Sequence, residues 1–69
     1  ENSGLTADYA DGELRLSAGV DEVFVYNEAG ALVANSRNCN RLALSVQAGM
    51  YIVRMIGNGG VSTEKIIVK

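Results

Sequence analysis

The fold is decided by a stretch near the C-terminus, Gly49-Met50-Tyr51-Ile52-Val53-Arg54-Met55, which is followed by a second apolar run from Val61 to Lys69. The first run alternates, so that Tyr51, Val53 and Met55 share one side. Successive side chains of a β-strand project to opposite faces, and this period of two therefore predicts a strand. Between the runs lies Gly57-Asn58-Gly59-Gly60, whose residues adopt positive φ at low cost. The stretch predicts a C-terminal β-hairpin around which smaller strands gather.

The upstream chain has the same character. Asp11-Gly12 and Asn27-Glu28-Ala29-Gly30 are turn signals between short alternating runs, and no run has a helical period of useful length. Asp21–Tyr26 is apolar on both faces, which is typical of a central strand. We expect about seven short strands, at residues 5–9, 13–16, 21–26, 31–35, 41–46, 49–55 and 61–69, with a loop at 36–40. The predicted fold is all-β, a small immunoglobulin-like antiparallel β-sandwich.

The alternation also predicts which side chains form the core. The predicted core residues are Leu14, Leu16, Val23, Val25, Leu32, Leu42, Leu44, Tyr51, Val53, Ile66 and Val68. A chain of 69 residues forms a single domain, in which residues 1–12 are either a linker or the first strand. Its abrupt start at Glu1 leads us to expect a domain excised from a longer protein.

The composition argues against an enzyme. The chain has no histidine, which is the commonest general base and a frequent metal ligand. Asp8, Asp11 and Glu13 surround a glycine, but their spacing does not match a calcium loop. Cys39 is the single cysteine and cannot close an internal disulfide, so we expect an incidental free thiol. We therefore expect no catalytic residues, no metal site and no cofactor.

Charge is distributed unevenly along the chain. Residues 1–28 hold seven acidic side chains and one arginine, whereas residues 29–69 hold five basic side chains and one glutamate. Two interpretations remain open: acidic and basic strands lie side by side and pair across the sheet, or the C-terminal half offers a basic face to a partner. The net charge of −2 argues against a nucleic-acid partner.

Three blocks of the sequence resemble a known pattern. Residues 23–33, VFVYNEAGALV, are similar to the first motif of the C-terminal sorting domains (Por secretion tails) of type IX secretion cargo. Residues 42–54, LALSVQAGMYIVR, resemble the second motif, and residues 65–69, KIIVK, resemble the closing block. Order and spacing agree over residues 13–69. The chain departs from the pattern in lacking the usual asparagine-proline opening and in having Gln47 where an apolar residue is common.

The resemblance implies a folded secretion signal rather than an enzyme. Such domains direct an attached upstream cargo across the outer membrane of Bacteroidetes-type bacteria, through the periplasm to the cell surface or the medium. Their partners are the type IX translocon and sortase-like surface-attachment components. The recognition residues implied here are Gly49, Tyr51, Lys65, Ile66, Ile67, Val68 and Lys69, with Asn27 and Gly30 forming a turn.

Two other functions fit the same predicted fold. A small β-sandwich can serve as a binding module that holds a polysaccharide on exposed aromatics, here Tyr9, Phe24 or Tyr26. For Tyr26 and Tyr51, a core or half-buried position within a strand is the simpler interpretation, because both lie within apolar strands. A structural spacer or adhesion domain of a secreted protein is the remaining alternative.

Overall fold

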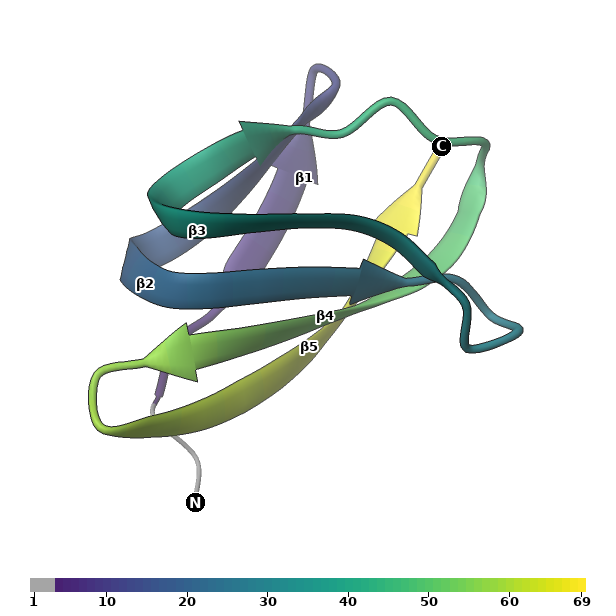
Figure 1. The fold of residues 1–69 in the computed structure, drawn as a ribbon. Helices are drawn as coiled ribbons and strands as arrows, with labels where there is room; N and C mark the ends of the chain where they lie inside the picture. Colours follow the sequence, from purple (N-terminus) through teal and green to yellow (C-terminus); the bar gives the residue numbers. More distant parts are fainter. Residues whose placement is uncertain (1–3) are drawn as a thin grey trace.

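The protein folds as a single antiparallel sheet. The computed structural model describes residues 4–69 and contains five strands and no helix within that range (Figure 1). The strands are β1 (Ala7–Ala10), β2 (Glu13–Tyr26), β3 (Leu32–Ala43), β4 (Gly49–Gly57) and β5 (Gly60–Val68). All pairings are antiparallel, and the predicted all-β class and the predicted C-terminal hairpin, β4–β5, are confirmed.

The centre of the sheet is β2, which has three partners. β3 pairs with one edge of β2 along most of its length. The other edge is divided, since β1 pairs with residues 13–16 and β4 pairs with residues 22–26. Between these halves the register with β3 jumps from Arg15↔Arg41 to Val20↔Cys39, so four residues of β2 stand against one of β3. Such a bulge bends the strand and increases its twist.

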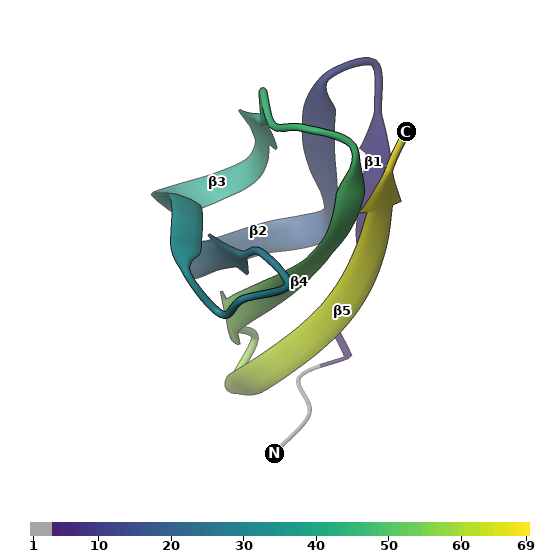
Figure 2. The same cartoon turned by 90° about the vertical axis from the view of Figure 1, so that its right-hand side faces the viewer.

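The bend folds the sheet over on itself. β1, with the first half of β2, lies behind the layer formed by β4, β5 and the second half of β2, and β1 comes beside β5 (Figures 1 and 2). The amide of Leu5 donates a hydrogen bond to Ser62 Oγ, at 3.1 Å, and so ties the start of the chain to β5. The result is an open, curled sheet whose concave side holds the core.

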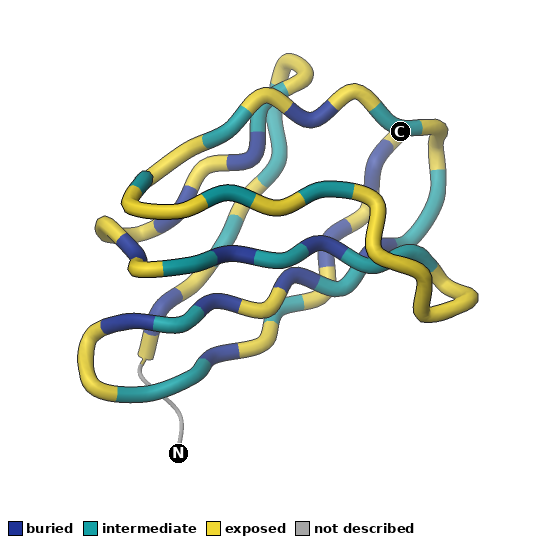
Figure 3. The backbone as a smooth tube through the Cα atoms, in the orientation of Figure 1, coloured by how far each residue is buried: buried dark blue, intermediate teal, exposed yellow. Residues whose placement is uncertain are grey.

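Nine of the eleven predicted core residues are buried, and these are Leu14, Leu16, Val23, Val25, Leu44, Tyr51, Val53, Ile66 and Val68. Leu42 is only partly buried. Burial alternates along β2 and β4, as Figure 3 shows. Leu5 and Val20 are buried although the sequence did not single them out, and Met55, expected on the same face as Tyr51 and Val53, is buried as well.

The prediction for Leu32 was wrong, because its side chain is 51% exposed. Val25 pairs with Ala34, but the next residue of β2, Tyr26, pairs with Leu32, so that Val33 is an extra residue in β3. Because strand side chains alternate with a period of two, one inserted residue moves Leu32 from the inner face to the outer one.

The number of strands was also predicted incorrectly, as five are found instead of seven. Segments 13–16 and 21–26 are the two halves of β2, and segment 31–35 continues through the expected loop at 36–40 into one strand, β3. The Ala18-Gly19 break is a bend that the chain passes without leaving the sheet. Asn38, at φ 50°, lies within β3 near the corresponding corner. Residues 44–46, which were expected to be strand, lie after β3 ends.

The close packing of β4 against the bend leads to a prediction about two glycines. A Cβ atom at Gly57 would lie 3.2 Å from both Asp21 N and Val20 Cα, which are backbone atoms with little freedom to move. We expect Gly57→Ala to destabilise the fold by about 1–3 kcal/mol through overpacking. Gly19→Ala is the matched control, since nothing lies within 4 Å of its Cβ position and its φ is not positive. Urea denaturation measures both, and equal stabilities would contradict this account.

Candidate functional site

Three segments that are distant in sequence meet at one end of the sheet. They are the β2–β3 turn (residues 27–31), the β3–β4 connection with the first residues of β4 (44–51), and residues 67–69, which are the last two residues of β5 and Lys69 beyond it. Together we call them the turn end. Gly49 pairs with Val68, which places the C-terminus beside the start of β4 (Figure 1). A Cβ atom at Gly49 would lie 3.8 Å from Glu28 Oε1, so the β2–β3 turn is also adjacent.

The β2–β3 turn is held by its asparagine. Asn27 Oδ1 accepts hydrogen bonds from the amides of Ala29 and Ala31, both at 3.0 Å. The amide of Gly30 donates to the Asn27 carbonyl at 2.9 Å, and Gly30 has φ 85°. Asparagine supplies the side-chain acceptor and glycine tolerates the positive φ. The predicted turn at residues 27–30 is therefore confirmed, and it presents a defined loop beside Gly49.

Two tyrosine hydroxyls hold the β3–β4 connection in place. Tyr51 is 7% exposed, and its hydroxyl donates to the Gln47 carbonyl at 2.7 Å. The hydroxyl of Tyr9 donates to the Leu44 carbonyl at 3.2 Å. Tyr51 is therefore a buried scaffold residue whose hydroxyl holds the β3–β4 connection in place. Any effect of Tyr51 on a partner is indirect, through the position of that connection.

A hollow of about 300 Å³ lies between the turn and the connection. Asn27, Glu28 and Ala29 line one side, and residues 47–51 line the other. Gly49 has φ 153°, a region of backbone space that L-residues rarely adopt. The first and second sequence blocks thus meet at one surface feature.

The closing block divides by face. Ile66 and Val68 are buried, at 6% and 4% exposure, and belong to the core. Lys65, Ile67 and Lys69 alternate with them and are exposed, Ile67 at 57%. Ile67 and Lys69 also line a second hollow, of about 320 Å³, together with Tyr9, Ala10 and Asp11. Of the predicted recognition residues at positions 65–69, only the exposed Lys65, Ile67 and Lys69 can contact a partner directly.

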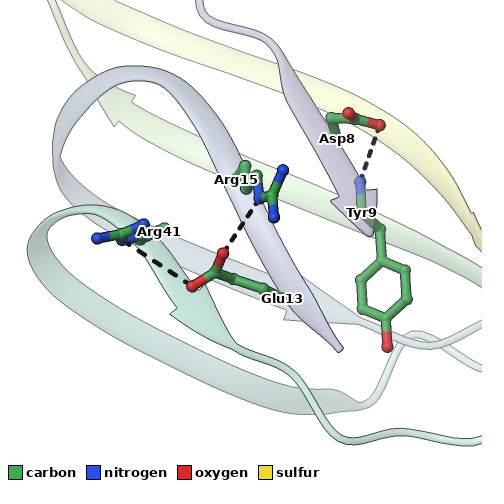
Figure 4. Close-up of polar contacts among 5 residues, drawn as sticks. All are labelled: Asp8, Tyr9, Glu13, Arg15 and Arg41. Carbon is green, nitrogen blue, oxygen red and sulfur yellow. Dashed lines mark hydrogen bonds and ion pairs between the residues drawn. The ribbon is translucent and has the colours of Figure 1, made fainter. Parts of the chain in front are cut away.

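The acidic residues near the first turn do not converge. Glu13 lies between two arginines, with its Oε1 3.1 Å from Arg15 Nε and its Oε2 3.9 Å from Arg41 Nε (Figure 4). Asp8 Oδ1 instead accepts a hydrogen bond from the amide of Tyr9 at 3.0 Å. Among residues 4–69 no group of three His, Cys, Asp or Glu side chains is placed to hold a metal ion. Cys39 is a half-buried free thiol in β3 that packs against the core.

Charge pairing across strands is confirmed for part of the chain. Arg41 pairs with Glu13, and Arg37 with Glu22 at 3.7 Å, in both cases between β3 and β2. Arg54, Lys65 and Lys69 take part in no ion pair within the described part of the chain. Sequence reasoning missed that Arg54 lies opposite Phe24, because that adjacency depends on the β2–β4 register.

No protein-family model matches the chain. No curated protein gives a significant match either. Within residues 4–69, no helix has the length and apolar character needed to cross a membrane.

The backbone of Gly49 generates a prediction for the turn end. Gly49→Val should destabilise the domain by about 1–3 kcal/mol, because an L-side chain at φ 153° is strained. The space around its Cβ position is ordinary, with the nearest atom at 3.8 Å, so the cost arises from the backbone. A synthetic chain carrying D-alanine at position 49 is the control, since a D-residue favours positive φ and should retain wild-type stability. Equal destabilisation by both residues in urea denaturation would show that space, and not φ, limits this position.

Proposed function

We propose that the domain is a C-terminal secretion signal recognised by a type IX secretion machinery, which carries the attached protein across the outer membrane. The observation that supports this most is the meeting of the three sorting-type blocks at the turn end. The first block forms the end of β2 and its turn, the second leads into β4, and the third is the end of β5. These strands are consecutive neighbours in the sheet, in the order β2-β4-β5.

The proposal gives each predicted residue a physical role. Gly49, Tyr51, Ile66 and Val68 shape and support the surface, whereas Lys65, Ile67 and Lys69 are exposed and contact the translocon. Asn27 and Gly30 hold the neighbouring turn in one conformation. A preformed surface binds with less ordering cost than a flexible tail, which suits a signal that must be recognised after folding.

The wider consequences belong to the same proposal. The domain is not an enzyme and needs no cofactor; its partners are the translocon, sortase-like attachment components and the upstream cargo. It passes through the periplasm and reaches the cell surface or the medium. We also propose that the curled sheet is a contracted immunoglobulin-like sandwich, because each half of the bent strands β2 and β3 contributes to a different layer.

Transplantation to a reporter tests the secretion signal. Residues 1–69 fused to the C-terminus of a periplasmic reporter, in a bacterium with a type IX system, should bring the reporter to the surface or medium. The same fusion should stay in the periplasm in a translocon-deficient strain. Lys65→Ala/Lys69→Ala should reduce export while leaving stability nearly unchanged, because both side chains are exposed. A fusion that remains periplasmic in the competent strain would rule the proposal out.

A carbohydrate-binding module is the second candidate, and one observation favours it. Phe24 and Tyr26 are two residues apart on β2, alternate with buried Val23 and Val25, and are therefore on the outer face, where both are only half-buried. Aromatic rings on an open sheet can stack on sugars. Tyr9 does not join them, because it lies on β1 with its hydroxyl bonded to Leu44.

Affinity electrophoresis tests the second candidate. If the domain holds polysaccharide, gels containing soluble glucans, xylans or mannans should retard it, and Phe24→Ala should abolish the retardation. Tyr9→Phe, which keeps the ring and lies off this face, is the control. Unretarded migration in all the gels would exclude binding of these polymers.

A further inference from the structure

The convex side of the sheet carries a continuous set of side chains across three strands. In an antiparallel pair, residues directly opposite each other project to the same face. Phe24 of β2 lies opposite Arg54 of β4, and Tyr26 lies opposite Ile52. Ile52 in turn lies opposite Lys65 of β5. We call Phe24, Tyr26, Ile52, Arg54, Ile56 and Lys65 the outer face.

The outer face is apolar with cations within it. Phe24, Tyr26, Ile52 and Ile56 are half-buried among their neighbours, whereas Arg54 and Lys65 are exposed. Exposed Ile67 extends the same surface, since it lies two residues beyond Lys65 on β5. The buried core residues within 4–69 include no Lys or Arg. The outer face is therefore an apolar surface distinct from the concave core.

The two cations have no internal partner. Neither Arg54 nor Lys65 forms an ion pair with another of the residues 4–69. Glu22 lies next to Ile56 on this side, but its carboxylate is 3.7 Å from Arg37 Nε. The surface is therefore positive although the whole chain has a net charge of −2. Charge complementarity selects a partner with carboxylates facing Arg54 and Lys65.

Other occupants fit less well. A symmetric pair of copies meeting through this face would bring the same unpaired cations together, and like charges across an interface are unfavourable. Attraction to an anionic membrane grows with the number of Lys and Arg residues near the surface. The outer face offers two such residues on a net acidic chain, and its aromatic side chains are half-buried. A protein surface that is apolar and acidic matches both features.

We infer that the outer face is a docking surface for an acidic, apolar protein surface of the export machinery. This inference rests on the proposed secretion function. It adds a second recognition surface, which is separate from the turn end. The apolar side chains supply buried area, and the two cations determine which partner is accepted. On this account, Lys65, which the secretion proposal already assigns to the translocon, lies on the outer face, where Arg54, Phe24 and Ile56 contact the same partner.

Charge reversal on the face is the test. Arg54→Glu/Lys65→Glu in the reporter fusion should lower surface export at least about tenfold, because opposing like charges cost more than 1.4 kcal/mol. Arg54→Lys/Lys65→Arg keeps both positive charges and should be exported as well as the wild type. Arg15→Glu/Arg41→Glu makes the same charge change at exposed positions outside the face. Because it also replaces the two ion pairs of Glu13 with like charges, its export is measured at a temperature at which urea denaturation shows it to be folded, and there it should match the wild type. Circular dichroism and urea denaturation of the purified variants establish that each is folded.

The outcomes separate the two proposals. Export of the wild-type fusion together with normal export of the Arg54→Glu/Lys65→Glu variant would overturn the docking face and leave the secretion signal intact. A wild-type fusion that is not exported would overturn both. Binding of the purified wild-type domain to phosphatidylglycerol vesicles, lost in the charge-reversed variant, would make a membrane the occupant and also overturn the inference.

A photo-cross-linker gives an independent measurement. With p-benzoylphenylalanine at position 24, the exported fusion should cross-link to a translocon or attachment component at a segment that contains aspartate or glutamate among apolar residues. A cross-link to a basic segment, or to cargo alone, would overturn the inference.

Discussion

One edge of β2 pairs with two different strands, and the bend in β2 between them shapes the whole sheet. β1 takes the first half of the edge and β4 takes the second, so a straight β2 would place both partners in one flat layer. The four-to-one bulge against β3 bends the strand between them. The bend turns β1 towards β5 and encloses apolar side chains between the two halves of one sheet. A chain of 69 residues thereby gains a concave core without a second, separate sheet.

The same strand order determines which segments of the chain lie together at the turn end. Because β4 follows β2 in the sheet and β5 follows β4, the end of β2, the start of β4 and the end of β5 lie at one end. Local hydrogen bonds then shape that end: Asn27 closes the turn, while the hydroxyls of Tyr9 and Tyr51 hold the β3–β4 connection. These hydrogen bonds give the turn end a defined shape within the folded domain.

The inward and outward side chains of each strand differ in burial and in character. On β5, Ile66 and Val68 stabilise the fold, while Lys65, Ile67 and Lys69 remain exposed. On β2 and β4 the outer side chains are half-buried and largely apolar, with Arg54 exposed among them. Because successive side chains of a strand point to opposite faces, one short segment both contributes to the core and exposes side chains on the surface.

The all-β class, the C-terminal hairpin, the turn at residues 27–30 and most of the inward positions follow from the amino-acid sequence alone. These are local properties, because side-chain alternation and turn chemistry act over a few neighbouring residues. Only the tertiary structure decided that two pairs of predicted strands join into β2 and β3, that a bulge exposes Leu32, and that Arg54 lies opposite Phe24. The hollow between Glu28 and Gly49, like the outer face, unites residues that are distant in sequence. Register and bending depend on which strand edges meet, and that long-range pairing is not encoded in any single segment.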